Sequence, residues 1–529
     1  MTTKLTGTGT LLRLALRRDR IRLPIWVLAI GLGMVYAVTA LGAVYATAAD
    51  RQVRADLMKS PAATMMSGPG YGLDNYSLGA MVTNEMVLWL AVPAAMMSIF
   101  AVIRHTRAEE ETGRAELVRS GVVGRAASDT AAVLLALIAN AAVAIVVALA
   151  MMAGGLPAAD SLAVGIGIGL TGITFAAVAL LTSQLTAHAR AASGMAVAVI
   201  GVAFVLRAVG DAAEPGGNAV SWLSPLAWTQ QTRAFVDLRW WPLLLSLPLA
   251  VAFVACAYVL AGRRDVGAGL LPAWLGRSKA SHYLASPFAL AARQQRGALI
   301  GWGSGLFLFA VASGSMSESA AEAVTANPDM ARVFAEAGQS PVDSFIATIT
   351  LFFALLVGAF VVSSLQRLRT EERTGHTEAV LATAVGRGTW LRAWLVYTVA
   401  AAAVLMLLSG LGVGLGAVAV GQDAFGVAMR AAVTQLPAVM VVAALTACLY
   451  GVRAGASSLG WIVMTYAFVI GMFGALLNLP SFFEKWSPFT HSPTGGEVEL
   501  VPIVVLLAVA ALLAVLAERA FSRRDLETA

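Results

Sequence analysis

Acidic side chains at a fixed spacing mark a short, highly charged segment in an otherwise apolar chain. The segment 107–125 contains Glu109, Glu110 and Glu116, with Gly113 between them. Helix-forming residues on both sides of a glycine favour two short helices that meet at a turn. Such an element, directly after a long apolar segment, is suited to dock a soluble protein at a membrane surface.

The same charged segment occurs a second time, 262 positions later, in residues 369–387. The residues that recur are Arg107, Glu109, Glu110, Thr112, Gly113, Glu116, Val118, Val123, Gly124 and Arg125, as Arg369, Glu371, Glu372, Thr374, Gly375, Glu378, Val380, Val385, Gly386 and Arg387. A solvated loop that only fixes topology would explain the arginines, but it would not explain matched glutamates and glycines. We therefore interpret both segments as docking elements. Glu111 is replaced by Arg373, and Arg114 by His376, so the two surfaces differ in charge.

The composition is that of an integral membrane protein. Of the 529 residues, 59% are hydrophobic and 12% are charged, whereas soluble domains are about 45–50% apolar and about 25% charged. Apolar runs of about 20 residues, the length that crosses a bilayer, occur throughout. We predict an all-α integral membrane protein with twelve transmembrane helices, near residues 24–47, 83–103, 129–153, 161–185, 191–210, 240–262, 298–316, 344–366, 390–419, 424–448, 454–478 and 499–517.

The twelve spans form two similar sets of six. Arg17 and Trp26 match Arg293 and Trp302 at an offset of 276, and the offset falls to 262 after the first external loop. We predict a first half at 1–262, with an interfacial helix at 10–23 and a charged loop at 104–128. A cytoplasmic linker with a second interfacial helix follows at 263–297, and a second half at 298–529 has its charged loop at 367–389. Glycines four residues apart, such as Gly165 with Gly169 and Gly412 with Gly416, predict close helix packing.

The basic residues predict the orientation. Most of the 36 lysines and arginines fall in segments 1–23, 104–128, 263–297 and 367–392. Because cytoplasmic loops carry an excess of lysine and arginine, both termini and both charged loops are expected in the cytoplasm. The net charge of +6 therefore reflects topology, and nucleic-acid binding is not expected. Arg207, at the outer end of the fifth span, is expected to reach outward to the membrane surface.

Other residues that could do chemistry are scattered. The five histidines are dispersed along the chain, and Cys256 and Cys448 lie far apart in apolar segments. No metal site is predicted from such spacing. A membrane enzyme that acts on lipid-linked substrates is a second alternative, but it would need carboxylates or histidines clustered at one face of the membrane.

The charged pattern supports a family resemblance. Glu-Glu-x-Thr-Gly-x-x-Glu-x-Val, followed by Val-Gly-Arg, resembles the loop between the second and third spans of ABC-2-type export permeases. The twelve-span form is similar to fused permeases of polyketide-antibiotic and multidrug exporters of the tetronasin-resistance type. The resemblance implies that each loop is a coupling helix seated on an ATP-binding subunit, through Glu109, Glu110, Gly113, Glu116 and Arg125, and through Glu371, Glu372, Gly375, Glu378 and Arg387.

The chain itself lacks the means to bind ATP in the usual way. A phosphate-binding loop of the type GxxxxGK[ST] requires a lysine after a glycine, and none of Lys4, Lys59, Lys279 and Lys485 follows one. The resemblance implies a transport subunit that is not itself an enzyme. A separate ABC ATPase, in two copies, would hold the ATP and Mg²⁺. The complex would export a small amphipathic drug across a bacterial cell membrane.

The resemblance also points to a substrate path, because spans two, five, eight and eleven face the midline in that family. Methionines and aromatic side chains suit loosely specified apolar ligands. Arg430, inside the tenth span, could meet an anionic group of the ligand or extend to the membrane surface. The candidate path residues are Glu85, Met86, Trp89 and Met97 in span two, Phe352 and Phe353 in span eight, Tyr466 and Phe473 in span eleven, and Arg430.

A proton-coupled secondary drug transporter is the alternative, since six plus six spans also describe that class. Such a protein would normally show a Gly-x-x-x-Asp-Arg loop between spans two and three. This chain has glutamates and a Thr-Gly pair there instead.

Overall fold

A computed structural model shows how these segments are arranged. It describes residues 4–59, 61–265, 267–271, 278–281, 284–318, 321, 340–473, 481–492 and 500–527. Within these ranges the regular structure is helical, with no strand. The chain divides into two units, Met1–Gly276 and Arg277–Ala529, and each is described by itself.

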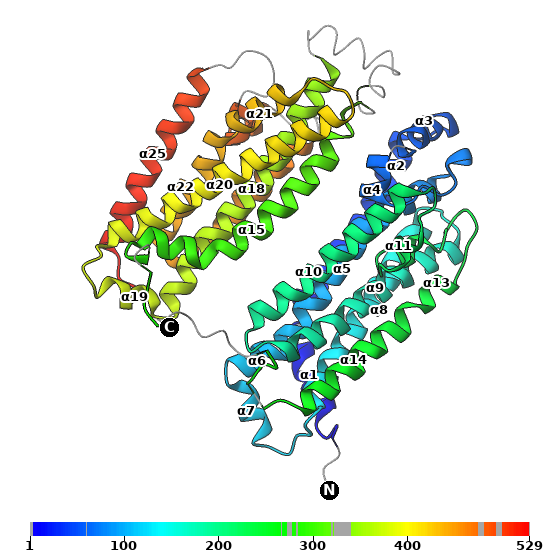
Figure 1. Ribbon diagram of the computed structural model, residues 1–529, viewed down its shortest axis with the longest axis horizontal. Coiled ribbons are helices and arrows are strands. Elements are labelled where there is room, and N and C mark those ends of the chain that lie inside the picture. The colour runs from blue at the N-terminus through cyan, green and yellow to red at the C-terminus, as the bar shows by residue number, and fades with distance from the viewer. Residues whose placement is uncertain are drawn as a thin grey trace. The chain divides into compact units, whose positions relative to one another are not determined.

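The first unit is a bundle of long helices with short helices at both ends (Figure 1). In Figure 1, α1, α6 and α7 lie at one end of this bundle, here called its charged end, and α3 and α4 lie at the opposite end. Its helices are α1 Thr8–Arg18, α2 Arg22–Val44, α3 Ala48–Met58, α4 Pro61–Ser67, α5 Leu78–His105, α6 Arg107–Glu111, α7 Arg114–Arg119, α8 Ala127–Ala153, α9 Ala158–Leu185, α10 Ala189–Ala213, α11 Ala219–Trp222, α12 Ala227–Gln230, α13 Trp241–Leu244 and α14 Ser246–Gly262.

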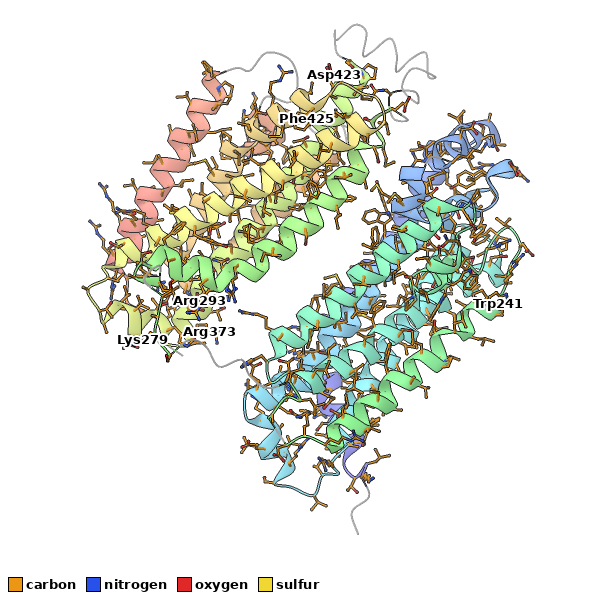
Figure 2. The ribbon with its side chains drawn as sticks, in the orientation of Figure 1. Trp241, Lys279, Arg293, Arg373, Asp423 and Phe425 are labelled. Carbon is orange, nitrogen blue, oxygen red and sulfur yellow. The ribbon has the colours of Figure 1, made fainter. Side chains whose placement is uncertain are left out.

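The second unit is built in the same way. Figure 2 shows Lys279, Arg293 and Arg373 at one end of it, its charged end, and Asp423 and Phe425 at the other. Its helices are α15 Pro287–Gly314, α18 Pro341–Arg373, α19 His376–Leu381, α20 Arg387–Ala419, α21 Phe425–Thr434, α22 Leu436–Val452, α23 Gly460–Phe473, α24 Ser481–Glu484 and α25 Leu500–Arg523.

The described residues include twelve helical segments long and apolar enough to cross a membrane. Because helices satisfy their own backbone hydrogen bonds, they are the form that apolar segments of this length take in a bilayer. The prediction of an all-α protein with twelve spans is confirmed. The tenth span contains both α21 and α22, which are separated at Gln435, just before Pro437.

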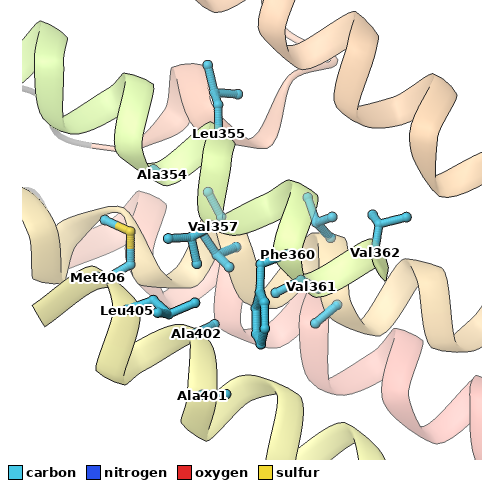
Figure 3. Close-up of a cluster of buried hydrophobic side chains, with 14 of the residues drawn as sticks. Ala354, Leu355, Val357, Phe360, Val361, Val362, Ala401, Ala402, Leu405 and Met406 are labelled. Carbon is cyan, nitrogen blue, oxygen red and sulfur yellow. The ribbon is translucent and has the colours of Figure 1, made fainter. Parts of the chain in front are cut away.

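Small residues bring the helices close together. A Cβ atom at Gly165 of α9 would clash with the carbonyl oxygen of Ala144 on α8, and one at Gly416 of α20 would clash with that of Val311 on α15. Only glycine permits this approach, so the packing predicted from the glycine spacing is confirmed. In the second unit, Phe360 of α18 fills the space beside Ala402 and Leu405 of α20 (Figure 3).

The beginnings of the two halves differ. In the first, α1 and α2 are separate helices, and Asp19 between them is buried and accepts hydrogen bonds from Arg104 (2.5 Å) and His105 (2.6 Å). In the second, the predicted interfacial helix is not separate, because α15 runs unbroken from Pro287 and bends near its start (Figure 1). Gln295 stands in the place of Asp19 and accepts a 2.7 Å hydrogen bond from the hydroxyl of Ser364.

Candidate functional site

The first charged loop forms two short helices joined at a glycine. Between α6 and α7, Gly113 has a φ of 72°, a conformation that residues with a side chain rarely adopt. The prediction of two helices meeting at this residue is confirmed. Gly375, with a φ of 77°, makes the same turn before α19. There the preceding helix, α18, is continuous with the eighth span, whereas in the first half α5 ends at His105 and α6 begins at Arg107.

Beyond each glycine the loop presents side chains to the surroundings. Glu116 and Glu378 are exposed at matching positions of α7 and α19. Leu117 is 77% exposed and Val122 is 73% exposed, although both are apolar. Among the described residues of the first unit, these side chains are left open to the surroundings.

Glu110 turns inward and joins three parts of the first half. Its carboxylate accepts two hydrogen bonds, of 2.8 and 2.9 Å, from Arg264, just after α14. Arg264 also donates to the side chain of Gln184 at the end of α9 (2.7 Å). Arg107, fully buried, lies 2.9 Å from Glu110 and donates to the carbonyl of Ser183 (2.8 Å). We call this group of five residues the first junction.

Glu372, the counterpart of Glu110, forms a similar group in the second half. It is 1% exposed, and Arg524, just after α25, donates two hydrogen bonds of 2.6 Å to it. The hydroxyl of Tyr450, near the end of α22, donates a third at 2.5 Å, and the N–H of Glu527 donates a fourth at 2.8 Å. Burial lowers the pKa of the Arg524 guanidinium, but its contacts with Glu372 outweigh this and leave its pKa raised. We call these four residues the second junction.

The arginine that ends each charged loop binds the same chain segment as the junction does. Arg125 donates to the carbonyl of Ala261 at 2.9 Å, and Arg387 donates to the carbonyl of Arg524 at 2.5 Å. Each charged loop is therefore bound at two points to the end of the sixth span of its half or to the residues that follow it.

The remaining predicted glutamates bind the start of their halves. Glu109 pairs with Arg18 at the end of α1 (2.7 Å). Glu371 accepts a longer hydrogen bond of 3.4 Å from Gln294 and lies 3.2 Å from His376. The first half thus uses an ion pair where the second uses a neutral amide.

A further difference lies between the charged loop and the following span. Arg119 of α7 and Asp129 of α8 line the same cavity of about 60 Å³ in the first half. Their counterparts at offset 262 are Leu381 and Leu391; Leu391 is fully buried in the apolar core and Leu381 packs against that core. Charged side chains in one half correspond to an apolar contact in the other.

Glu85, a candidate for the substrate path, is bound by α3, a helix at the end of the first unit opposite the charged end. Its carboxylate accepts hydrogen bonds of 3.1 and 2.7 Å from Arg54 of α3, and the hydroxyl of Tyr76 lies 3.5 Å away. Burial lowers the pKa of Arg54, but the contact with Glu85 outweighs it and leaves that pKa raised. The carboxylate therefore anchors α3 to α5.

The other path candidates have varied surroundings. Met97 and Phe353 are 1% and 0% exposed and pack inside their own halves. Met86 and Tyr466 are half-buried, whereas Trp89 and Arg430 are exposed. Phe352 and Phe353 are in edge-to-face contact, with ring centres 6.1 Å apart. The side chain of Phe473 lies outside the described residues.

Sequence reasoning missed Arg264, Arg524, Gln184 and Tyr450. The two arginines are 260 positions apart, rather than 262 as the glutamates are, so an alignment of the halves does not pair them. Their only signal was a basic residue soon after the last apolar run of each half. Among the residues that the structure describes, no three His, Cys, Asp or Glu side chains are grouped in a way that could hold a metal ion.

Comparison with known proteins places the chain in a family. The family model described as "Multidrug efflux system permease Rv1217c, C-terminal domain" matches residues 9–260 and residues 284–522. The multidrug efflux system permease protein Rv1217c of Mycobacterium tuberculosis is 38% identical over 531 residues, which cover 98% of this chain and 95% of that protein. The chain therefore belongs to the Rv1217c family of multidrug efflux system permeases.

Proposed function

We propose that this chain is the permease subunit of an ATP-driven ABC-2-type exporter that moves amphipathic drugs out of a bacterial cell. The observation that carries the proposal is the match of both halves to the multidrug efflux permease family. The charged loops supply the second support, since each half presents an exposed helix after a fixed glycine turn.

In this proposal the charged ends of both units lie in the cytoplasm, and an ABC ATPase subunit docks at each charged loop. The ATPase subunits bind ATP and Mg²⁺, and nucleotide-driven closure moves the loops. The chain provides the path for the drug and its partner provides the energy, so the chain is a transport subunit rather than an enzyme.

The test uses the full chain co-expressed with a candidate ABC ATPase subunit, chosen because its gene neighbours the gene of this chain. Inside-out vesicles should accumulate a fluorescent amphipathic drug when ATP is added, and a protonophore should leave this uptake intact. A Walker-A lysine substitution in the ATPase should abolish it. Uptake that follows an imposed proton gradient without ATP would instead identify the proton-coupled alternative and overturn the proposal.

A further inference from the structure

The two junctions, together with the neighbouring bonds from Arg125 and Arg387, are charged-loop contacts that both halves share. Arg18–Glu109 in the first half corresponds to Gln294–Glu371 in the second, and the pair Arg119 and Asp129 corresponds to two leucines. By contrast, a doubly hydrogen-bonded Glu–Arg pair occurs in both, with all four bonds between 2.6 and 2.9 Å. Two parallel bonds fix the orientation of both groups, as a single bond does not.

The shared pair is built from different sequence positions. Arg264 is the second residue after α14, whereas Arg524 is the first after α25. The third partner also differs, since Gln184 receives a bond from Arg264 and Tyr450 donates one to Glu372. Different residues thus reproduce the same connection among the charged loop, the end of the fourth span and the segment after the sixth span.

In the first half that segment contacts the end of α9 at further points beyond Arg264. The N–H groups of Leu270 and Leu271 donate to the carbonyls of Gln184 and Leu185, at 3.2 and 2.8 Å. A Cβ atom at Gly269 would lie 2.6 Å from the backbone nitrogen of Ala187, so only glycine permits this approach. Residues 269–271 therefore pack directly on the end of α9.

We infer that the residues after the sixth span of each half, 264, 265 and 267–271 in the first and 524–527 in the second, are transmission elements. They carry displacement of each charged loop to the fourth and sixth spans through Glu110–Arg264 and Glu372–Arg524. A loop attached only to the spans on either side of it could move those two spans alone. The junction makes the loop, α9 and the end of α14 one mechanical group in the first half, and the loop, α22 and the end of α25 one group in the second. Arg264 and Arg524 are positioning residues, since the proposed ATPase docks on the opposite, exposed face of the loop.

This inference rests on the proposed function and makes a separate claim within it. Loss of a junction should leave the ATPase bound, because the exposed residues around Leu117 are unchanged, but it should uncouple hydrolysis from transport. A purely structural role for the pair would instead reduce assembly and transport together.

The second junction gives the sharper experiment, because Glu372 has a single arginine partner there. Arg524→Gln is compared with Arg523→Gln. The control removes the same charge from the neighbouring residue, which is exposed. In the complex, Arg524→Gln should lower ATP-driven drug uptake about tenfold while the ATPase co-purifies in the wild-type ratio. Arg523→Gln should transport at the wild-type rate.

A double-mutant cycle separates the pair from either residue alone. Glu372→Gln combined with Arg524→Gln should be no worse than either single variant, because both remove one interaction. Exchange of the two charges, Glu372→Arg with Arg524→Glu, should recover part of the uptake. If Arg524→Gln does not fold, Arg524→Lys takes its place in the experiment. Lysine keeps the positive charge but cannot make two parallel hydrogen bonds, so this variant should show an intermediate loss of uptake.

The first half supplies an independent repeat of the test, with Arg264→Gln against the exposed Arg263→Gln. Wild-type uptake by Arg524→Gln and Arg264→Gln, or additive losses in the cycle, would overturn the inference and leave the proposed function in place. A wild-type complex that shows no ATP-driven uptake would overturn the proposed function, and the inference with it.

Discussion

The guanidinium of Arg207 and the carboxylate of Asp211, one turn apart on α10, form a fully buried ion pair at 3.0 Å. The expectation that Arg207 extends outward to the membrane surface is wrong. The arginine also donates to the carbonyls of Thr64 and Met65 at the end of α4, so its partners lie inside the first unit. Arg207, near the end of α10, therefore holds α4 in place.

Replacing Arg207 with methionine should destabilise the first unit, because it leaves Asp211 buried without its partner. The expected loss is about 3–5 kcal/mol, measured as a lower unfolding temperature of the purified chain in detergent. Arg190→Met, at an exposed position of the same helix, is the control and should change little. Replacing both members of the pair with apolar residues should cost less than Arg207→Met alone, and a larger cost would contradict this explanation.

Tyr76 predicts a loss of stability at high pH. Burial, and then the charge of Glu85, raise the pKa of its hydroxyl above the usual value of about 10. The folded chain therefore keeps this proton when the unfolded chain releases it. The contribution to stability is complete below about pH 10 and declines as the pH rises above that value. Tyr76→Phe should flatten the decline by up to about 1.4 kcal/mol per pH unit, measured by unfolding between pH 9 and 11. An unchanged slope would rule out Tyr76 as its source.

Two glycines, one in the contact between α8 and α9 and one on α10, should respond differently to an added side chain. Gly165→Ala should destabilise the first unit, because the added carbon meets the carbonyl of Ala144. Gly194→Ala, in the interior of α10 with nothing within 4 Å of the added carbon, should instead be neutral or stabilise by up to about 1 kcal/mol. Thermal unfolding of both purified variants tests the pair, and equal effects would argue against the close approach.

The exposed leucine of the first charged loop should mark the docking surface. Leu117→Asp should reduce the ATPase that co-purifies with the permease several-fold, since it places a charge on an exposed apolar contact. The matched control is Leu223→Asp, which changes a residue that is 69% exposed after α11, toward the opposite end of the first unit. Full ATPase recovery with Leu117→Asp would place the docking surface elsewhere.

Much of the fold could be predicted from the sequence because the bilayer imposes simple rules. The apolar runs, the glycine spacing and the glycine turns at Gly113 and Gly375 each reflect one local requirement: span length, close packing or a left-handed backbone. The continuous α15 was not predicted from the repeat. Pro24, which lacks the backbone N–H that a continuous helix uses, is replaced by Ile300 in the second half, and α15 runs through that position.

The partners of Glu110 and Glu372 could not be predicted, for a different reason. Each glutamate binds an arginine more than 150 residues away, and the repeat does not align the two arginines. Aligning the halves identified which acidic residues recur, but it could not show that these two turn inward while Glu116 and Glu378 face outward. That distinction depends on where the chain returns after the sixth span.

The leucines that stand in place of Arg119 and Asp129 limit how far the charged loops can be exchanged between the halves. The first charged loop and the start of α8, grafted into the second half, would carry an arginine and an aspartate into the site where Leu391 now packs among apolar side chains. The reverse graft would bring leucines into a cavity bordered by glutamates and arginines. Each loop therefore matches the bundle of its own half, and it can be exchanged only together with the residues that surround it.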